Sequence, residues 1–236
     1  TLGNALQGFR GLRELDAHGS QHSRLVLQAS SGRMPALSRI DLSASNVSDH
    51  DLSDLDFPQL EILRLQDTHI TDEGVGQIAK QCGELRQLNL ARTQITLGAI
   101  LQCAKLRRLE RLDVHSTDLT ERVRLREGSL PALRELHLGT TGVDDNTLAN
   151  LLGTAPNIRF LDVSGCDVSD GIVQTLSETR IESIDVSHLP ISRANLVALA
   201  KMPSLRLLIC SRNMVDDAFR NDLETRFPKC LLFVRE

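Results

Sequence analysis

The chain has 236 residues, of which 41% are hydrophobic and 25% are charged, so it contains enough apolar material for a sizeable core. A formal net charge of −4 gives no general attraction for phosphate backbones or anionic lipids, which argues against nucleic acids and membrane surfaces as partners. No apolar stretch approaches the ~20 residues that a transmembrane helix requires.

A short apolar pattern, Leu-x-x-Leu-x-Leu with conservative substitutions, recurs along the chain. Nine copies follow one another at intervals of 23 to 25 residues, beginning at Leu12, Leu37, Leu60, Leu85, Leu109, Leu133, Ile158, Ile181 and Leu205. In each copy, that first residue is position one. A single unit cannot bury its own apolar side chains, whereas stacked units share a continuous core, so the pattern predicts a repeat protein.

Each copy is predicted to begin with a strand and to continue through a turn into a short helix. Position nine is usually Ser, Thr, Cys or Asn, and a hydroxyl there can bond to the backbone where the chain leaves the strand. Segments 71–75 and 143–148 place Thr or Asp before an apolar run of helical period, which is typical of a helix N-cap. The first copy is irregular, and there we expect Arg24 to Leu27 to be extended.

The two ends of the chain differ from the repeats between them. Residues 1–11 have the pattern of the helical half of a preceding repeat, and residues 12–229 contain the nine repeats. A closing copy begins at Cys230, so residues 230–236 are predicted to form a terminal capping strand. We therefore expect one domain over residues 1–236.

The strand pattern, the small or polar ninth position and the acidic or hydroxyl helix starts resemble the leucine-rich repeat superfamily. Within it, the chain is most similar to the helix-backed repeats of cysteine-containing, F-box-associated and related bacterial proteins. This resemblance implies an α/β, right-handed solenoid of horseshoe shape. It places a parallel sheet on the concave face, helices on the convex face, and recognition of another protein on the concave face.

Side chains alternate along a strand, so positions four and six should point into the core and positions three, five and seven toward the concave face. Position five then forms a row containing Asp113, His137, Asp162 and Asp185, with neighbours ~5 Å apart. Arginines and glutamates at position two are expected to form exposed ion pairs of small energy. Phe160 is the one aromatic side chain predicted to reach the concave face. The predicted partner-binding residues are Arg64, Arg111, Asp113, His115, His137, Arg159, Phe160, Asp162 and Asp185.

The leading interpretation is a protein–protein interaction module of a larger regulator, adaptor or effector, with no catalytic residue, cofactor or metal. One alternative is a structural or self-assembling repeat array whose concave face binds nothing. Another is a metal-dependent enzyme built on Asp113, His137 and Asp162. The same row is also compatible with a solvated polar surface in which the histidine relieves repulsion between aspartates.

Five cysteines are scattered along the chain without the spacing of disulfide pairs. They are expected to be buried, reduced thiols, which favours a cytoplasmic location.

Overall fold

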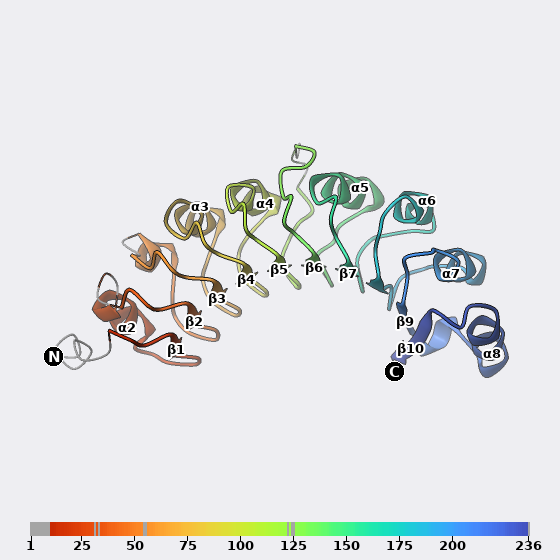
Figure 1. Cartoon of the computed structure of the whole chain (residues 1–236), viewed down its shortest axis with the longest axis horizontal. Coiled ribbons are helices and arrows are strands. Elements are labelled where there is room, and N and C mark those ends of the chain that lie inside the picture. Colours follow the sequence, from red (N-terminus) through yellow and green to blue (C-terminus); the bar gives the residue numbers. More distant parts are fainter. Residues whose placement is uncertain are drawn as a thin grey trace. The chain divides into compact units, whose positions relative to one another are not determined.

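Short strands alternate with helices along the chain in the order that the repeats predict (Figure 1). The structure, a computed structural model, describes residues 10–30, 32, 34–53, 56–121, 123 and 126–235. The chain divides into two compact units, Thr1–Val123 and Arg124–Glu236. The predicted helical half at residues 1–11 lies almost wholly outside the described residues, and a single domain over residues 1–236 stays a prediction.

The first unit contains a parallel sheet in which each strand pairs with the next one along the chain. Its strands are β1 (Glu14–Asp16), β2 (Arg39–Asp41), β3 (Ile62–Arg64), β4 (Gln87–Asn89) and β5 (Arg111–Asp113). Between them lie the helices α2 (Ser23–Ser30), α3 (Asp72–Gln81) and α4 (Leu97–Cys103), and the 3-10 helix η1 (Asp49–Leu52).

The second unit repeats this arrangement, again with parallel pairing between successive strands. Its strands are β6 (Glu135–His137), β7 (Phe160–Asp162), β8 (Ser183–Asp185), β9 (Leu207–Ser211) and β10 (Leu231–Arg235). Its helices are α5 (Asp145–Thr154), α6 (Ile172–Ser177), α7 (Arg193–Ala200), α8 (Asp217–Arg226) and the 3-10 helix η2 (Arg212–Met214).

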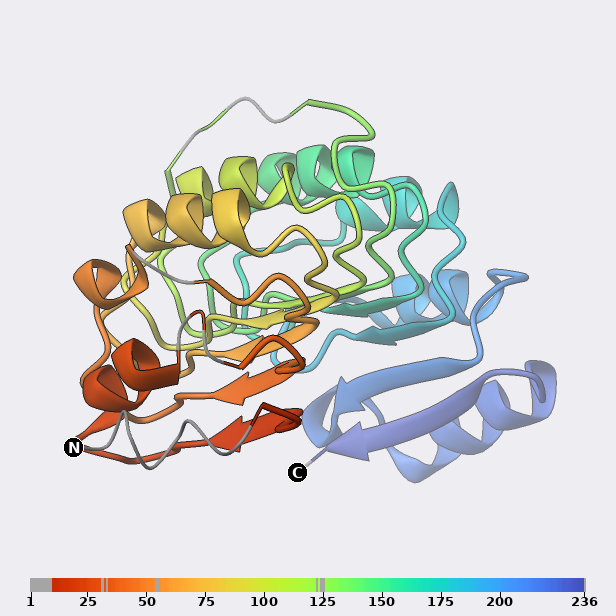
Figure 2. The same ribbon diagram turned by 60° about the vertical axis from the view of Figure 1, so that its left-hand side comes forward.

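The register of the strands creates the core of each unit. Position-four residues pair with one another across the strands, as Ile40 pairs with Leu63 and Leu136 with Leu161, and these four are buried. In each unit the helices lie on one side of the sheet, and the described residues place no helix on the other side (Figure 2). We call that second side the open face. The predicted α/β leucine-rich repeat solenoid of strand, turn and helix is thereby confirmed.

Hydroxyl groups at position nine close the turn after the strand, as predicted. Thr68 donates to the carbonyl of Leu65 at 2.5 Å, and Thr93 donates to the carbonyl of Leu90 at 2.6 Å. Both side chains are buried, so each bond satisfies polar groups that water does not reach. The same contact recurs at Ser45, Thr117 and Thr141.

A second polar contact, which the sequence did not suggest, joins successive repeats at the starts of their helices. The Asp72 carboxylate accepts the backbone N–H of Thr96 at 2.8 Å and its hydroxyl at 2.6 Å. Asp49 binds Thr71 in the same way, and Asp145 binds Ser169. Because Thr71 and Thr96 are also the N-caps of α3 and α4, Asp49 and Asp72 each hold the helix start of the following repeat in place.

The prediction of an extended segment at Arg24 to Leu27 was wrong, because these residues belong to α2. The run Leu25-Val26-Leu27 has the apolar composition of a strand, but only Leu27 is buried, whereas Leu25 is 53% exposed. The hydroxyl of Ser23 donates to the carbonyl of Ser20 at 2.8 Å and is buried four residues before Leu27, which is the spacing of one helical face.

Position eight has a left-handed backbone in the first eight repeats. The residues are Gly19, Ala44, Asp67, Arg92, Ser116, Thr140, Gly165 and His188, with φ between 53° and 65° in every case. A non-glycine residue in this conformation costs roughly 1–2 kcal/mol. Six of these eight residues are not glycine, and the tight turn into position nine is formed at them despite that cost.

Replacing Gly165 by alanine should lower the free energy of unfolding by about 1–2 kcal/mol, because the left-handed backbone disfavours a β-carbon. The added atom would also lie 3.0 Å from Cγ2 of Thr140. Urea denaturation followed by circular dichroism measures the change. Gly153→Ala is the matched control: that glycine lies in α5, where the nearest described atom outside the helix to an added β-carbon is Cγ of Glu127 at 3.7 Å, and its replacement should stabilise the helix by up to about 1 kcal/mol. Equal effects of the two substitutions would contradict the role of the turn.

Candidate functional site

The predicted binding residues lie on or beside the strands of the open face. Arg64, Arg111 and Asp113 belong to β3 and β5 of the first unit, and His115 follows β5. The second unit carries the remaining members, which are His137, Arg159, Phe160, Asp162 and Asp185. Within that unit His137, Asp162 and Asp185 pair in register on adjacent strands, so the predicted row exists there. Asp113 belongs to the other unit.

Most acidic residues of the position-five row also have a local structural role. The Asp162 carboxylate accepts the backbone N–H of Ser164 at 2.9 Å, and Asp113 accepts that of His115 at 3.2 Å. The same contact, from position five to the backbone of position seven, recurs at Asp16, Asp41, Asn89 and Asp185. A short acceptor side chain at this point caps the N–H that follows the strand, which explains the preference for Asp and Asn.

The two histidines of the predicted site have different surroundings. Nδ1 of His115 lies 2.8 Å from Oδ1 of Asp113, and the two side chains are 32% and 14% exposed. Nε2 of His137 lies 4.0 Å from Oε2 of Glu135, and this nitrogen is buried with no hydrogen-bond partner among the described residues. His115 therefore shields part of the Asp113 carboxylate from the open face.

Position seven differs from the expectation that it points toward the concave face. Ser43, Ala91, Ser187 and Ser211 are buried there, because the chain turns toward the helix side directly after the strand. At position two the expected exposed ion pairs are present: Arg86 pairs with Glu110, and Nε of Arg159 lies 3.2 Å from Glu182. The pairing of Arg159 reduces its value as a predicted anchor.

Asp185 differs from the other predicted contacts because only 5% of its side chain is exposed. Its Oδ2 lies 2.8 Å from the guanidinium of Arg235, which reaches across β9 from β10. Oδ1 accepts the N–H of Ser187 at 2.9 Å. This carboxylate therefore anchors the last strand.

Arg235→Gln should lower the free energy of unfolding by about 2 kcal/mol, because it leaves the buried Asp185 carboxylate without its counter-ion. Chemical denaturation measures this loss, and adding Asp185→Asn should recover at least half of it. Arg193→Gln is the control, since Arg193 also lies 2.8 Å from an aspartate, but both side chains are more than half exposed. That change should cost less than about 1 kcal/mol. A double variant as unstable as Arg235→Gln would refute the anchoring role.

Sequence reasoning missed an apolar surface at the end of the second unit. We define the terminal apolar patch as the open-face side chains Phe160, Leu207, Ile209, Leu231 and Phe233. Leu231 is 70% exposed, Phe233 55% and Phe160 44%. The register places Leu231 beside Leu207 and Phe233 beside Ile209. Phe160 lies in the position-three row of Leu207 and Leu231, two strands from Leu207 with Ser183 between them.

The patch was missed because the closing copy begins one residue earlier than predicted. With a start at Cys230, Phe233 would take position four and point into the core. The observed pairing of Leu232 with Leu208 gives position four to Leu232 instead. A slip of one residue exchanges the two faces of a strand, so Leu231 and Phe233 appear on the open face. The last strand begins with four consecutive apolar residues, so its sequence alone does not reveal which of its faces is buried.

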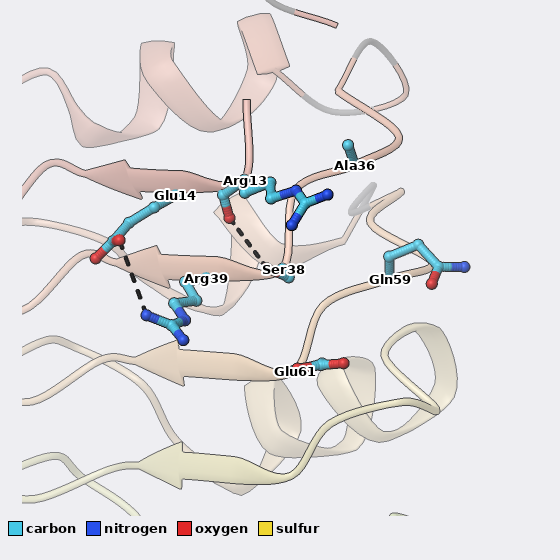
Figure 3. Close-up of a pocket in the computed structure, with 7 residues that line it drawn as sticks. All are labelled: Arg13, Glu14, Ala36, Ser38, Arg39, Gln59 and Glu61. Atoms are coloured by element: carbon cyan, nitrogen blue, oxygen red, sulfur yellow. Dashed lines mark hydrogen bonds and ion pairs between the residues drawn. The ribbon is translucent and has the colours of Figure 1, made fainter. Parts of the chain in front are cut away.

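Two hollows lie over the first unit. The larger, of about 620 Å³, is at the strand starts and is lined by Arg13, Glu14, Ala36, Ser38, Arg39, Gln59 and Glu61 (Figure 3). Its two arginines and two glutamates balance, and Arg39 lies 4.0 Å from Glu14. The smaller, of about 180 Å³, lies over β3 to β5. We call it the arginine hollow, and its lining is Ile62, Leu63, Arg64, Gln87, Leu88, Asn89, Arg111 and Asp113.

Among the described residues, no three His, Cys, Asp or Glu side chains are grouped as ligands of a metal ion would be. The arrangement of the described residues therefore does not support the hypothesis of a metal-dependent enzyme built on Asp113, His137 and Asp162. Within the same described part of the chain, no helix combines the length and the apolar character needed to cross a bilayer.

All five cysteines are buried free thiols, as predicted. Burial raises the pKa of Cys82 and of Cys103 to about 12 each, and the nearby Asp72 carboxylate contributes to the shift at Cys103. Burial and the charge of Asp185 raise the pKa of Cys210 to about 11. A raised pKa keeps the thiol protonated at neutral pH, so these three groups are poor nucleophiles.

At pH 8 the folded protein should leave Cys82, Cys103 and Cys210 unmodified by the disulfide reagent DTNB, since the reactive thiolate is scarce and the sulfur is buried. Mass spectrometry of the labelled sites measures this, and the same reagent in 6 M guanidinium should modify all five cysteines. Rapid labelling of any of these three in the folded chain would contradict the assigned environment.

Comparison with known proteins agrees with this architecture. A family model described as FBD-associated F-box protein At5g56370, LRR repeats, matches residues 96–227, which is more than half of the chain. A second model, Leucine Rich repeat, matches residues 58–79. No curated protein sequence matches the chain.

Among solved structures, the crystal structure of internalin C2 from Listeria monocytogenes is similar, with a TM-score of 0.55 and 22% sequence identity. The similarity covers 75% of this chain and 73% of that chain. At this level of identity, the likeness concerns the fold.

Proposed function

The chain belongs to the leucine-rich repeat family represented by the repeats of FBD-associated F-box proteins, and from this premise we propose that it holds a partner protein against its open face. Leucine-rich repeat domains generally mediate protein–protein interaction. The partner-specific part of the proposal is supported by the side chains that this chain presents on the sheet.

The terminal apolar patch is the observation that carries the proposal. Phe160 and Phe233 are both about half exposed, although burial of an aromatic ring removes a large apolar area from water. Clustered apolar side chains on a surface commonly mark a binding site, and exposed aromatic rings are frequent anchors of protein interfaces. Only 3% of the residues are aromatic, and the patch adds Phe233 to Phe160 as a second aromatic anchor on the open face.

Polar residues lie beside this patch on the same sheet. His137 and Asp162 lie in the position-five row, in register with Asp185 and Ile209. An apolar centre with a charged rim is the usual anatomy of a protein interface, in which the rim contributes orientation more than affinity. We assign Asp162 and His137 to the rim, and Arg64, Arg111, Asp113 and His115 to a second contact area on the first unit.

We further propose that the chain is a binding module without catalytic activity, and that it works in the cytoplasm. The raised thiol pKa values of Cys82, Cys103 and Cys210 support the first point, because these three cysteines are not activated nucleophiles. Five buried free thiols support the second, since reduced cysteines are typical of a reducing compartment.

The double variant Phe160→Ala, Phe233→Ala should lose at least about tenfold in affinity for the partner, because aromatic anchors of this kind typically contribute more than 1 kcal/mol each. Affinity capture with quantitative mass spectrometry, using extract from the source cell, provides the comparison with the wild-type chain. Leu25→Ala, Leu101→Ala is the matched control, since those side chains are 53% and 39% exposed on the helices α2 and α4.

A partner retained by the wild type and the control, and lost from the patch variant, would support recognition on the open face. Equal retention by all three proteins would overturn it. Sedimentation analysis then tests the alternative of a self-assembling array. The mass of such an array rises with protein concentration in the wild type and in the patch variant alike.

A further inference from the structure

The side of the second unit where its strands begin carries an excess of positive charge. Five segments lead into β6 to β10, and we call them together the basic edge: residues 126–134, 155–159, 178–182, 201–206 and 227–230. They contain seven arginines and lysines but only three glutamates, which gives a net charge of +4 in a chain whose net charge is −4. Because the strands are parallel and in register, these segments lie along one side of the sheet.

Position two of the repeat brings part of this charge into one row. The backbone N–H of Arg159 donates to the carbonyl of Arg134 at 2.8 Å, and the same contact continues the row through Glu182 to Arg206. Nε of Arg159 lies 3.2 Å from Oε1 of Glu182, so these two charges compensate each other. Arg134 and Arg206, at the two ends of the row, form no ion pair with any carboxylate of the described residues. The expected pairing of position-two charges is therefore incomplete in this unit.

Two cations without a carboxylate partner among the described residues border the terminal apolar patch. Arg206 directly precedes Leu207, and Lys229 lies two residues before Leu231. Nη1 of Arg206 donates to the carbonyl of Pro203 at 3.3 Å, a neutral acceptor that holds the guanidinium group near the start of β9 without cancelling its charge. Lys229 is exposed in the turn before β10. An apolar surface and uncompensated positive charge therefore adjoin on β9 and β10.

The opposite side of the same sheet has the opposite charge. The segments that follow β6 to β9 contain six aspartates and one arginine: residues 138–145, 163–171, 186–192 and 212–217. A long polyanion, such as a nucleic acid strand laid across the open face, would meet these aspartates as well as the basic edge. A short acidic segment beside the terminal apolar patch would meet the basic edge alone, so the distribution of charge favours a protein as the partner.

We propose that the partner held on the terminal apolar patch presents an acidic segment to the basic edge. Its apolar side chains lie on the patch, and its Asp or Glu side chains lie beside Arg206 and Lys229. Carboxylates attract guanidinium and ammonium groups, and complementary charge beside an apolar centre sets orientation and accelerates association. Arg134, Arg180 and Lys201 extend the attraction along the same side of the sheet. The inference rests on the proposed function, because it names the chemistry of the partner at that site.

The test compares the binding of three acetylated, amidated peptides to the full chain. The acidic probe is Glu-Glu-Phe-Leu-Glu-Phe, and its two counterparts carry Gln or Lys in place of every Glu. Isothermal titration calorimetry should show that the Gln peptide binds at least about fivefold more weakly than the acidic one, since exposed charge pairs each contribute a few-fold at most. The Lys peptide should bind more weakly still. Added salt should reduce the advantage of the acidic peptide, because salt screens exposed charges.

Nuclear magnetic resonance of the chain labelled with nitrogen-15 locates the contact. The acidic peptide should shift the backbone amide signals of β9 and β10, including those of Leu207 and Phe233. Signals of β3 to β5 should stay in place, because those strands lie outside the patch and the basic edge.

Arg206→Gln, Lys229→Gln should weaken binding of the acidic peptide by at least about threefold and leave that of the Gln peptide unchanged. The matched control Lys80→Gln, Arg107→Gln also removes one lysine and one arginine, both exposed, but from the first unit, and should leave all affinities unchanged. Circular dichroism establishes that both variants fold.

Equal binding of the acidic and Gln peptides, an equal loss in the two cation variants, shifts confined to strands other than β9 and β10, or no binding of any peptide would each overturn the proposal. Tighter binding of oligothymidine, or of vesicles containing phosphatidylserine, would also overturn it and assign the basic edge to a nucleic acid or an anionic membrane. Equal binding of both peptides that is lost in Phe160→Ala, Phe233→Ala would remove the acidic partner and leave the proposed function standing. Failure of the partner-capture comparison would overturn the proposed function itself.

Discussion

The parallel register between very short strands is the constraint on which the rest of the structure depends. Most strands contain three residues, so one strand pair forms few hydrogen bonds and buries little surface by itself. Each strand is stabilised because it pairs in register with the strand of the next repeat. The apolar position-four row that results is the core, and the two rows beside it, at positions three and five, form the open face.

Polar side chains make hydrogen bonds to backbone groups that such short strands leave without a partner in the sheet. Position five caps the backbone directly after the strand, position nine closes the turn, and an aspartate at the helix start binds the next repeat, as Asp72 binds Thr96. Each contact recurs in several repeats at the same position, so the preference for Asp, Asn, Ser or Thr at that position follows from the hydrogen bond it makes. The aspartates of the open face therefore have two roles, since Asp162 caps Ser164 and also carries charge at the rim of the patch.

The sequence predicted the architecture well because the pattern recurs. A short apolar segment alone can be a strand or part of a helix, but the same pattern in nine copies indicates which. Nine copies of one apolar pattern, with hydroxyls at a constant distance, are more informative than any single helix or strand. Prediction failed where a residue stands outside the consensus. Arg24 to Leu27 have the composition of a strand in the least regular repeat, and the last strand has no complete copy to define its register.

The candidate site was less predictable for the same reason. The rows of the open face follow from periodicity, and Arg64, Arg111, Asp113 and Phe160 lie where expected. The burial of Asp185 depends on Arg235, a residue 50 positions later in the chain. The terminal apolar patch depends on one residue of register, and the contrast between the two hollows depends on which charges neighbour each other in space.

The register of β10 implies that part of the terminal apolar patch depends on the number of residues between α8 and β10. Phe233 faces outward because of the number of residues between α8 and the last strand, and Val234, its neighbour, takes the other side. Deleting or inserting one residue in that connection would exchange the two faces while leaving every side chain of the strand unchanged. A related chain can therefore gain or lose this apolar surface in one evolutionary step, with no substitution in the strand itself.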